Sequence, residues 1–217
     1  MIIEQLGPPD ADHSTGLLLR WRDRLLFAVE PRDHWRDERD TQLVRFVGIG
    51  GHLEPGETWA EAVRREAMEE SGLAVTLLSP QCTYLLQDDG TVQDITAALD
   101  WSDPPRPCFI WSAVYRFGRP PNERARPFVN AVFLAAASDD AKPHPAAEMP
   151  AIVALTEAQL CRAAAHSIPL ADLLAGGATI WESEPLPRST LMAPGGSAQW
   201  YAALLAHRGR SGGCVST

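Results

Sequence analysis

Residues 51–73 read GHLEPGETWAEAVRREAMEESGL, a glycine-containing loop that runs into a segment rich in alanine and glutamate. Thr58 and Glu61 have the spacing of a capping box, in which each side chain accepts a hydrogen bond from the other residue's backbone N–H. Gly72 stands where helices commonly end in a left-handed glycine. The sequence therefore predicts a helix between Thr58 and Gly72.

The carboxylates of this segment fall on one side of the predicted helix. Glu66, Glu69 and Glu70 are spaced i, i+3 and i+4, so their side chains share one face. Such close anions raise each other's pKa unless a cation compensates them, and carboxylate oxygens are ligands that Mg²⁺ shares with substrate phosphates. The cluster predicts a metal-binding face, and the alternative is a solvated acidic face. Arg65 is placed to pair with Glu69 or with Glu57.

The complete pattern resembles the Nudix box, the signature of the Nudix hydrolase family. Agreement at this many positions is far more specific than a short glycine motif. Ala67 stands where a larger aliphatic residue is more usual, which touches helix packing and not the chemistry. The resemblance implies an α/β fold, namely an α/β/α sandwich with a mixed central β-sheet, here with an α-rich C-terminal extension. The matching positions are Gly51, Glu57, Arg65, Glu66, Glu69, Glu70, Gly72 and Leu73.

The resemblance also implies an activity: hydrolysis of a diphosphate linked to another moiety, often a nucleoside, with Mg²⁺ or, as a substitute, Mn²⁺. By position, the metal ligands would be Glu66, Glu69, Glu70 and the main chain at Gly51. Arg65 would steady these carboxylates through an ion pair.

Further roles follow from position in the motif. Glu57 would fix the loop to the helix, while Gly56 and Gly72 would permit the close turns on either side of it. In the family the general base is often a glutamate on a loop before a late strand, a position that Glu148 matches. Glu123 and Glu69 are the alternatives for the base.

The rest of the chain predicts strands connected by polar segments. Pro31–Thr41 is predicted as a loop. Its Arg32 and Trp35, and Arg45 beyond it, are candidates for substrate contact. The alternative for Trp35 is a partly buried loop residue. Residues 1–167 are expected to form the Nudix domain, and residues 168–217 an extension that packs on it or on a dimer partner. Strands are expected at 14–21, 25–30, 43–49, 74–86 with a break at 79–80, 92–97, 108–117, 128–137, 151–155 and 178–182, and helices at 156–166, 170–174 and 198–207.

Composition limits the classes of function. The chain has 217 residues and a formal net charge of −9, which disfavours binding to a nucleic-acid backbone as the main task. The four cysteines lack the spacing of a zinc site or a disulfide framework. A basic leader followed by an apolar segment is not seen, nor is an apolar run as long as a membrane span, so a cytoplasmic setting without membrane contact is expected.

Two other classes of function stay open at this point. A Nudix-type isomerase acting on an isoprenoid diphosphate would need a catalytic cysteine, for which Cys82 and Cys108 are the candidates. A binding or regulatory module would keep the fold without catalysis, but such modules usually lose box glutamates that are intact here. Markers of ADP-ribose, dinucleoside-polyphosphate and coenzyme A hydrolases are missing, so the expected substrate is a nucleoside di- or triphosphate derivative in general.

Overall fold

The fold is taken from a computed structural model, which describes residues 3, 6–8, 10–38, 40–101, 105–117, 124–146 and 149–211. The helices are α1 (Trp59–Ser71), α2 (Glu157–Ala165), α3 (Leu170–Ala175) and α4 (Gly196–Ser211). The strands are β1 (Asp12–Trp21), β2 (Arg24–Val29), β3 (Arg36–Glu38), β4 (Thr41–Val47), β5 (Val75–Leu78), β6 (Tyr84–Gln87), β7 (Val92–Asp94), β8 (Phe109–Phe117), β9 (Arg124–Ala137), β10 (Ala151–Leu155), β11 (Ile168–Pro169), β12 (Thr179–Glu182) and β13 (Leu191–Pro194).

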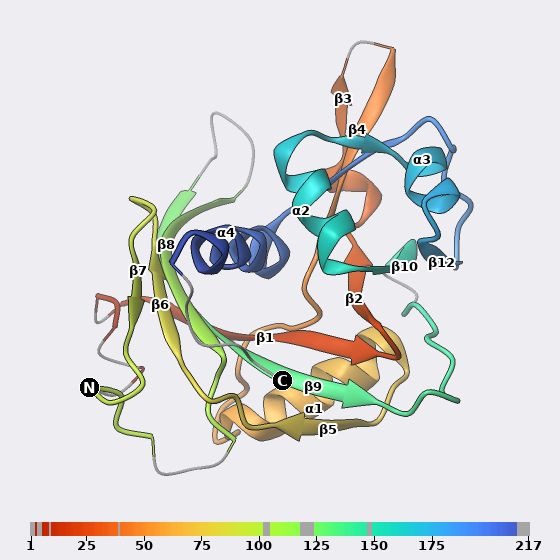
Figure 1. The fold of residues 1–217 in the computed structure, drawn as a ribbon. Helices are drawn as coiled ribbons and strands as arrows, with labels where there is room; N and C mark the ends of the chain where they lie inside the picture. Colours follow the sequence, from red (N-terminus) through yellow and green to blue (C-terminus); the bar gives the residue numbers. More distant parts are fainter. Residues whose placement is uncertain are drawn as a thin grey trace.

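The strands form one mixed sheet with helices on both faces. Its main path runs β11-β13-β4-β2-β1-β9-β8-β6-β7, and β3, β5, β10 and β12 pair at its sides. Strand β1 is parallel to β9, β4 to β13 and β6 to β8, and the other pairs are antiparallel. Figure 1 shows α1 on one side of β1 and β9 and α4 on the other. The predicted α/β/α sandwich with a mixed sheet is confirmed.

Alternate residues of the central strands face two separate cores, as the two-residue period of a strand requires. In β1, Leu17 and Leu19 belong to the core that includes Val63 and Ala67 of α1. Leu18 between them belongs to the other core, which contains residues of α2, α3 and α4. The sheet therefore separates the box helix from the helices of the C-terminal part.

Helix α1 begins and ends at the predicted signals. The Thr58 hydroxyl accepts from the Glu61 N–H at 3.3 Å, and the Glu61 carboxylate accepts from the Thr58 N–H at 2.9 Å. Gly72 adopts the left-handed conformation with φ of 67°, and its N–H donates to the Met68 carbonyl. The predicted helix and both of its ends are confirmed.

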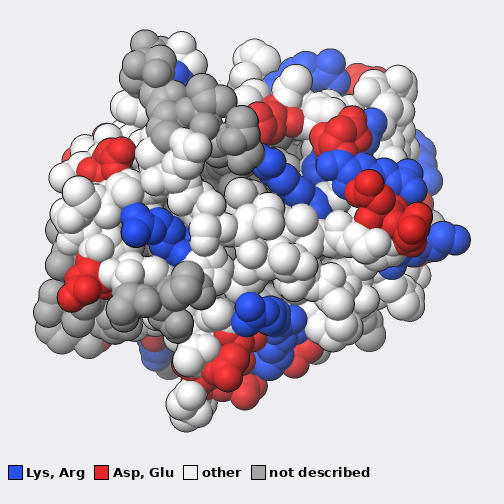
Figure 2. All heavy atoms as spheres, turned by 60° about the horizontal axis from the view of Figure 1, so that its bottom comes forward, with Lys and Arg blue, Asp and Glu red and all other residues white. Residues whose placement is uncertain are grey.

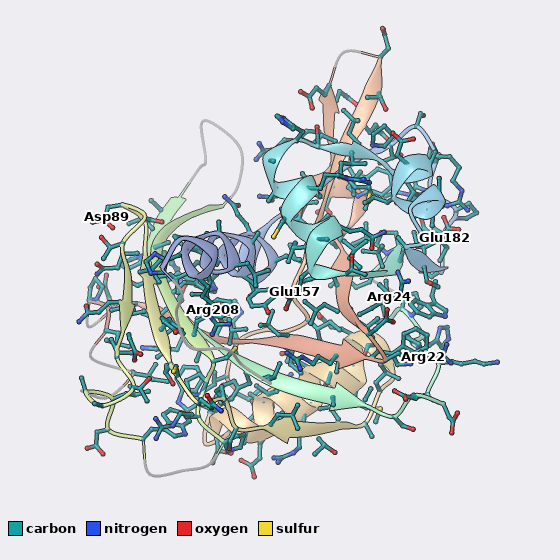
Figure 3. All side chains as sticks on the ribbon, viewed as in Figure 1. Arg22, Arg24, Asp89, Glu157, Glu182 and Arg208 are labelled. Atoms are coloured by element: carbon teal, nitrogen blue, oxygen red, sulfur yellow. The ribbon has the colours of Figure 1, made fainter. Side chains whose placement is uncertain are left out.

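The segment after residue 167 takes part in the same sheet. Strand β13 lies parallel to β4, with Leu191 opposite Leu43, and β12 pairs with β10. Tyr201 of α4 stacks on Phe109 with ring centroids 6.2 Å apart, and its hydroxyl donates to the Glu157 carboxylate at 2.6 Å. Figure 3 labels Glu157, the first residue of α2, close to α4. The extension thus adds strands as well as helices to the body of the protein.

The predicted loop at Pro31–Thr41 is wrong in part. Arg32–His34 form a 3-10 turn, and β3 pairs antiparallel with β4 to make a short hairpin. All three residues of β3 are charged and exposed, so the strand lacks the alternation of apolar and polar residues that identifies a half-buried strand. Strands β11 and β13 were likewise not predicted. Of the helices in the described part of the chain, none is both long and apolar enough to cross a membrane.

Candidate active site

The glycine loop before α1 is attached to β1 by backbone hydrogen bonds. The N–H of Leu17 donates to the Ile49 carbonyl at 2.7 Å, and the N–H of Thr15 donates to the Gly51 carbonyl at 2.8 Å. Gly50 has φ of +150°, and a Cβ there would overlap the backbone of β1. The loop can therefore lie flat on β1 only because this position lacks a side chain.

Gly51 makes room for a carboxylate of α1. A Cβ on Gly51 would lie 2.6 Å from the Glu66 carboxyl carbon, so the Glu66 carboxylate lies directly against the loop. Glu66 is 9% exposed. This burial raises the pKa of Glu66, and the hydrogen bond from Arg65 opposes the rise. Loop and helix are therefore fitted to each other at these two residues.

The guanidinium of Arg65 connects the loop to the acidic face of α1. It binds Glu57 at two points, Nε to Oε1 at 2.9 Å and Nη2 to Oε2 at 3.0 Å, and Nη2 also donates to the His52 carbonyl at 3.0 Å. Nη1 donates to Glu66 at 2.8 Å and to Glu69 at 2.9 Å. The hydrogen bond with Glu57 is the main reason why the pKa of Arg65 is raised. One cation is thus shared by three carboxylates.

The third predicted metal ligand, Glu70, is turned toward the loop. Its Oε2 accepts from the Gly50 N–H at 3.1 Å, whereas Glu66 and Glu69 are both held by Arg65. In the described ranges, no three His, Cys, Asp or Glu side chains close around a common point for a metal ion. The donors nevertheless fit a hard divalent cation, because they are carboxylates in excess over their shared arginine.

A cavity of about 700 Å³ opens beside the loop, between the sheet and the first turn of α4. This volume lies within the range of small-molecule sites in proteins, roughly 300–1,000 Å³. Its lining joins residues that are far apart in the sequence: Asp12, Ser14, Thr15, Glu30, Pro31, His34, Arg45, Val47, Gly48, Gly50, Gly51, His52, Glu70, Trp111, Arg126, Phe128, Asn130, Met149, Gly196 and Ser197.

Two ion pairs line this cavity. Arg45 donates from Nε to Glu30 at 2.9 Å, and Arg126 lies 3.4 Å from Asp12. Both arginines are therefore positioned by acidic partners. Figure 2 shows that acidic and basic side chains also lie side by side on the face of the molecule in view, between stretches of uncharged surface.

The predicted substrate contacts separate into two groups. Arg45 lines the cavity, and Arg32 and Trp35 are not among the described residues that line it. Trp35 is 9% exposed, and its indole N–H donates to the Glu30 carbonyl at 2.7 Å. Arg32 lies over the Trp35 ring and donates to Glu184 at 2.7 Å. Of the two, Trp35 thus contacts the lining residue Glu30, and Arg32 contacts Trp35.

The predicted general bases Glu148 and Glu123 lie outside the described residues. Met149, next to Glu148 in the chain, lines the cavity. Cys108, a candidate for isomerase chemistry, is 8% exposed and its thiol donates to the Val132 carbonyl at 3.0 Å. Burial raises its pKa to about 12, which leaves almost no thiolate near neutral pH.

Several lining residues were missed from the sequence, among them Ser14, Trp111, Asn130 and Ser197. One signal was present for Asn130, a polar residue within the otherwise apolar segment 128–137, because a polar residue on a buried face needs a partner such as the Ser14 hydroxyl. The two do meet, since the Asn130 side-chain amide donates to the Ser14 hydroxyl at 2.5 Å. For Ser197 we find no such signal in the sequence.

Comparison with known proteins identifies the family of the chain. A family model, the NUDIX domain, matches residues 13–174. Similar solved structures include a NUDIX hydrolase from Nitrosomonas europaea (14% identity, TM-score 0.38, 69% of this chain and 59% of that chain, less than two thirds of its length). Another is a NUDIX-family hydrolase from Clostridium perfringens (18% identity, TM-score 0.41, 69% of this chain and 83% of that chain). A third is an ADP-ribose pyrophosphatase from Streptococcus suis (13% identity, TM-score 0.39, 68% of this chain and 75% of that chain). Among curated proteins none matches. Because the family model covers most of the chain, from β1 into α3, the protein belongs to the Nudix family.

Proposed function

We propose that the protein hydrolyses the diphosphate bond of a nucleoside di- or triphosphate derivative with Mg²⁺, for which Mn²⁺ can substitute. The observation that carries this proposal is the arrangement around Arg65, where one guanidinium serves Glu57, Glu66 and Glu69 beside a cavity of nucleotide size. An excess of carboxylates at the edge of such a cavity favours a cation and, with it, a substrate that carries phosphates.

Glu66, Glu69 and Glu70 would hold the metal, with the Gly51 carbonyl as a further oxygen ligand. That carbonyl accepts one hydrogen bond from Thr15, which leaves it a second lone pair. When bound, the cation supplies charge neutralisation to the diphosphate and orientation to the attacking water. Arg65 keeps Glu66 and Glu69 in place, because a fork of fixed N–H groups holds two carboxylates at defined positions.

In the proposed reaction a water oxygen forms a bond to phosphorus and the bridging P–O bond of the diphosphate breaks. The water gives a proton to a carboxylate, and the leaving phosphate departs with the bonding electron pair. We propose Glu148 as the base, because it precedes the late strand β10 in the sequence, as the base of the family often does. Glu69 and Glu123 remain alternatives for this role.

The test is release of phosphate or pyrophosphate with Mg²⁺ from nucleoside triphosphates, nucleotide sugars, ADP-ribose, dinucleoside polyphosphates and NADH. We expect turnover of at least one class, reduced by roughly a hundredfold or more in Glu70→Gln, since even partners of metal ligands affect activity by 10- to 100-fold. Glu38→Gln, the same change on the exposed strand β3, is the matched control and should retain wild-type turnover.

Other outcomes would identify other functions. A rearranged isoprenoid diphosphate without phosphate release would indicate an isomerase. Binding of nucleotides with no turnover, in Mn²⁺ as in Mg²⁺, would indicate a sensing or regulatory module. Equal turnover by wild type and Glu70→Gln would contradict the proposed role of the box carboxylates.

A further inference from the structure

One wall of the cavity is built by a part of the chain beyond the family match, which ends at residue 174. Gly196 and Ser197, in the first turn of α4, line the cavity. A Cβ on Gly16 would lie 2.8 Å from the Ser197 hydroxyl, and a Cβ on Gly48 would lie 2.8 Å from the Ser197 Cβ. Ser197 therefore fills a notch that exists because both positions are glycine, and α4 is in close contact with the floor of the cavity.

The floor is a row of residues across three neighbouring strands. Trp111 of β8 is the register partner of Asn130 of β9, and Asn130 is the partner of Ser14 of β1. Paired residues on adjacent strands point to the same face of the sheet, and Trp111 belongs to the core on the α4 side. The three side chains therefore lie next to one another beneath the first turn of α4.

Two buried polar atoms of this row have no hydrogen-bond partner in the described structure: the Asn130 Oδ1, an acceptor, and the Trp111 Nε1–H, a donor. Asn130 is 5% exposed and Trp111 is 6% exposed. The Asn130 Oδ1 lies 3.1 Å from the position of a Cβ on Gly16, the position that Ser197 also approaches. Leaving a buried polar group unpaired costs about 1–3 kcal/mol, so such atoms usually meet a partner.

The ring of Trp111 packs against two other aromatic rings. Trp200 of α4 stacks on it with centroids 5.6 Å apart and planes at 19°, and Phe128 lies against it with centroids 5.1 Å apart. The extension thus contributes Trp200, which fixes the direction of the indole N–H, and Ser197, which closes the notch beside the Asn130 acceptor.

Resting on the function proposed above, we infer that this donor–acceptor pair recognises the non-phosphate part of the substrate, and that the part recognised is a planar heterocycle. A nucleobase edge carries an acceptor beside a donor, which matches Trp111 Nε1–H and Asn130 Oδ1. A second anion does not fit, because the Asn130 oxygen would face it. An isoprenoid chain does not fit either, because it would leave both buried atoms unpaired. Trp111 and Asn130 are therefore specificity-determining residues, and Trp200 is a positioning residue.

The inference is tested by binding without metal and without hydrolysis. In EDTA, calorimetry would compare the four nucleoside 5′-monophosphates with ribose 5-phosphate, which lacks the ring. We expect at least one nucleotide to bind about tenfold or more tightly than ribose 5-phosphate. Asn130→Leu, which removes the whole side-chain amide, and Trp111→Phe, which removes the indole N–H, should each abolish that ratio. Trp181→Phe, which alters an indole packed on Trp21 and not lining the cavity, should retain it.

A ratio near one in the wild type, or a ratio that survives in folded Asn130→Leu and Trp111→Phe, would overturn the inference. If one of these two variants does not fold, the binding ratio of the other variant tests the inference. Trp200→Leu is an independent test by kinetics. In this variant KM for a nucleotide substrate should rise with little change in kcat. An unchanged KM would show that Trp200 does not belong to the subsite. Because phosphate release by the wild type is measured separately, failure of this subsite is distinguishable from failure of the proposed hydrolysis.

Discussion

Arg65 and Glu57 form a two-point ion pair, in which Nε and Nη2 lie 2.9 and 3.0 Å from the two carboxylate oxygens. Glu57 precedes α1 and Arg65 lies in its middle, so the pair connects the loop to the helix. The same guanidinium also holds Glu66 and Glu69. One side chain therefore positions both the loop and the carboxylates proposed to bind the metal.

Arg65→Lys should lower the free energy of unfolding by about 1–3 kcal/mol, because an ammonium cannot reproduce the fork and leaves partly buried carboxylates without partners. Urea unfolding measures this. Arg64→Lys is the control, since the neighbouring arginine is exposed and bonds only to the Ala60 carbonyl of its own helix among the interactions described. Similar losses in the two variants would contradict the role assigned to Arg65.

Gly51→Ala should reduce turnover by about a hundredfold, because the new methyl group would displace the Glu66 carboxylate and misplacements of this size have such effects. Phosphate release and thermal unfolding would be measured together. Gly209→Ala in α4 is the control, because a Cβ there meets nothing within 4 Å. Wild-type turnover by Gly51→Ala would show that the contact between loop and carboxylate is dispensable.

Stability should depend on pH through Glu57. The hydrogen bond from Arg65 holds the pKa of Glu57 below its ordinary value of 4.5. The stabilisation is therefore present above that value and is lost as the pH falls through the lower native value. Urea unfolding across the acid range should show a smaller loss of stability in Glu57→Gln than in the wild type. Parallel curves for the two proteins would contradict this.

Cys108 should be unreactive in the folded protein. Its burial raises the pKa to about 12, so its thiolate is scarce at pH values where alkylating reagents are used. Iodoacetamide should label the partly exposed Cys82 and Cys161 in the folded protein and Cys108 only after unfolding, as peptide mass spectrometry would show. Cys108→Ala should also keep the hydrolytic activity. Rapid labelling of Cys108 in the folded protein, or an isomerase activity that is lost in Cys108→Ala, would instead support catalysis by this cysteine.

The box helix was predictable because its signals are local. Thr58, Glu61 and Gly72 specify both ends of α1 within a few residues, and the motif spacing indicated the family. The partner of Arg65 was left open between Glu57 and Glu69, and the structure provides both. Five N–H donors on one guanidinium allow several partners, which spacing along the chain does not reveal.

The cavity was not predictable in the same way, because its lining depends on contacts between distant segments. Ser14 and Asn130 are 116 positions apart, yet they meet across β1 and β9. Strand β13 pairs with β4 although no local pattern distinguishes that edge. Strand β3 escaped prediction for the opposite reason, since its three charged residues pair by backbone alone and bury none of their side chains.

The notch at Gly16 and Gly48 is filled by a residue that is synthesised long after the notch itself. Gly16 and Gly48 leave the ribosome early, together with the loop and α1, whereas Ser197 is synthesised much later. A nascent chain therefore carries its complete box of carboxylates before the wall that covers the floor of the cavity exists. A truncation before α4 would keep the box, Trp111 and Asn130, but it would lose Ser197 and Trp200, the residues of α4 that pack against them.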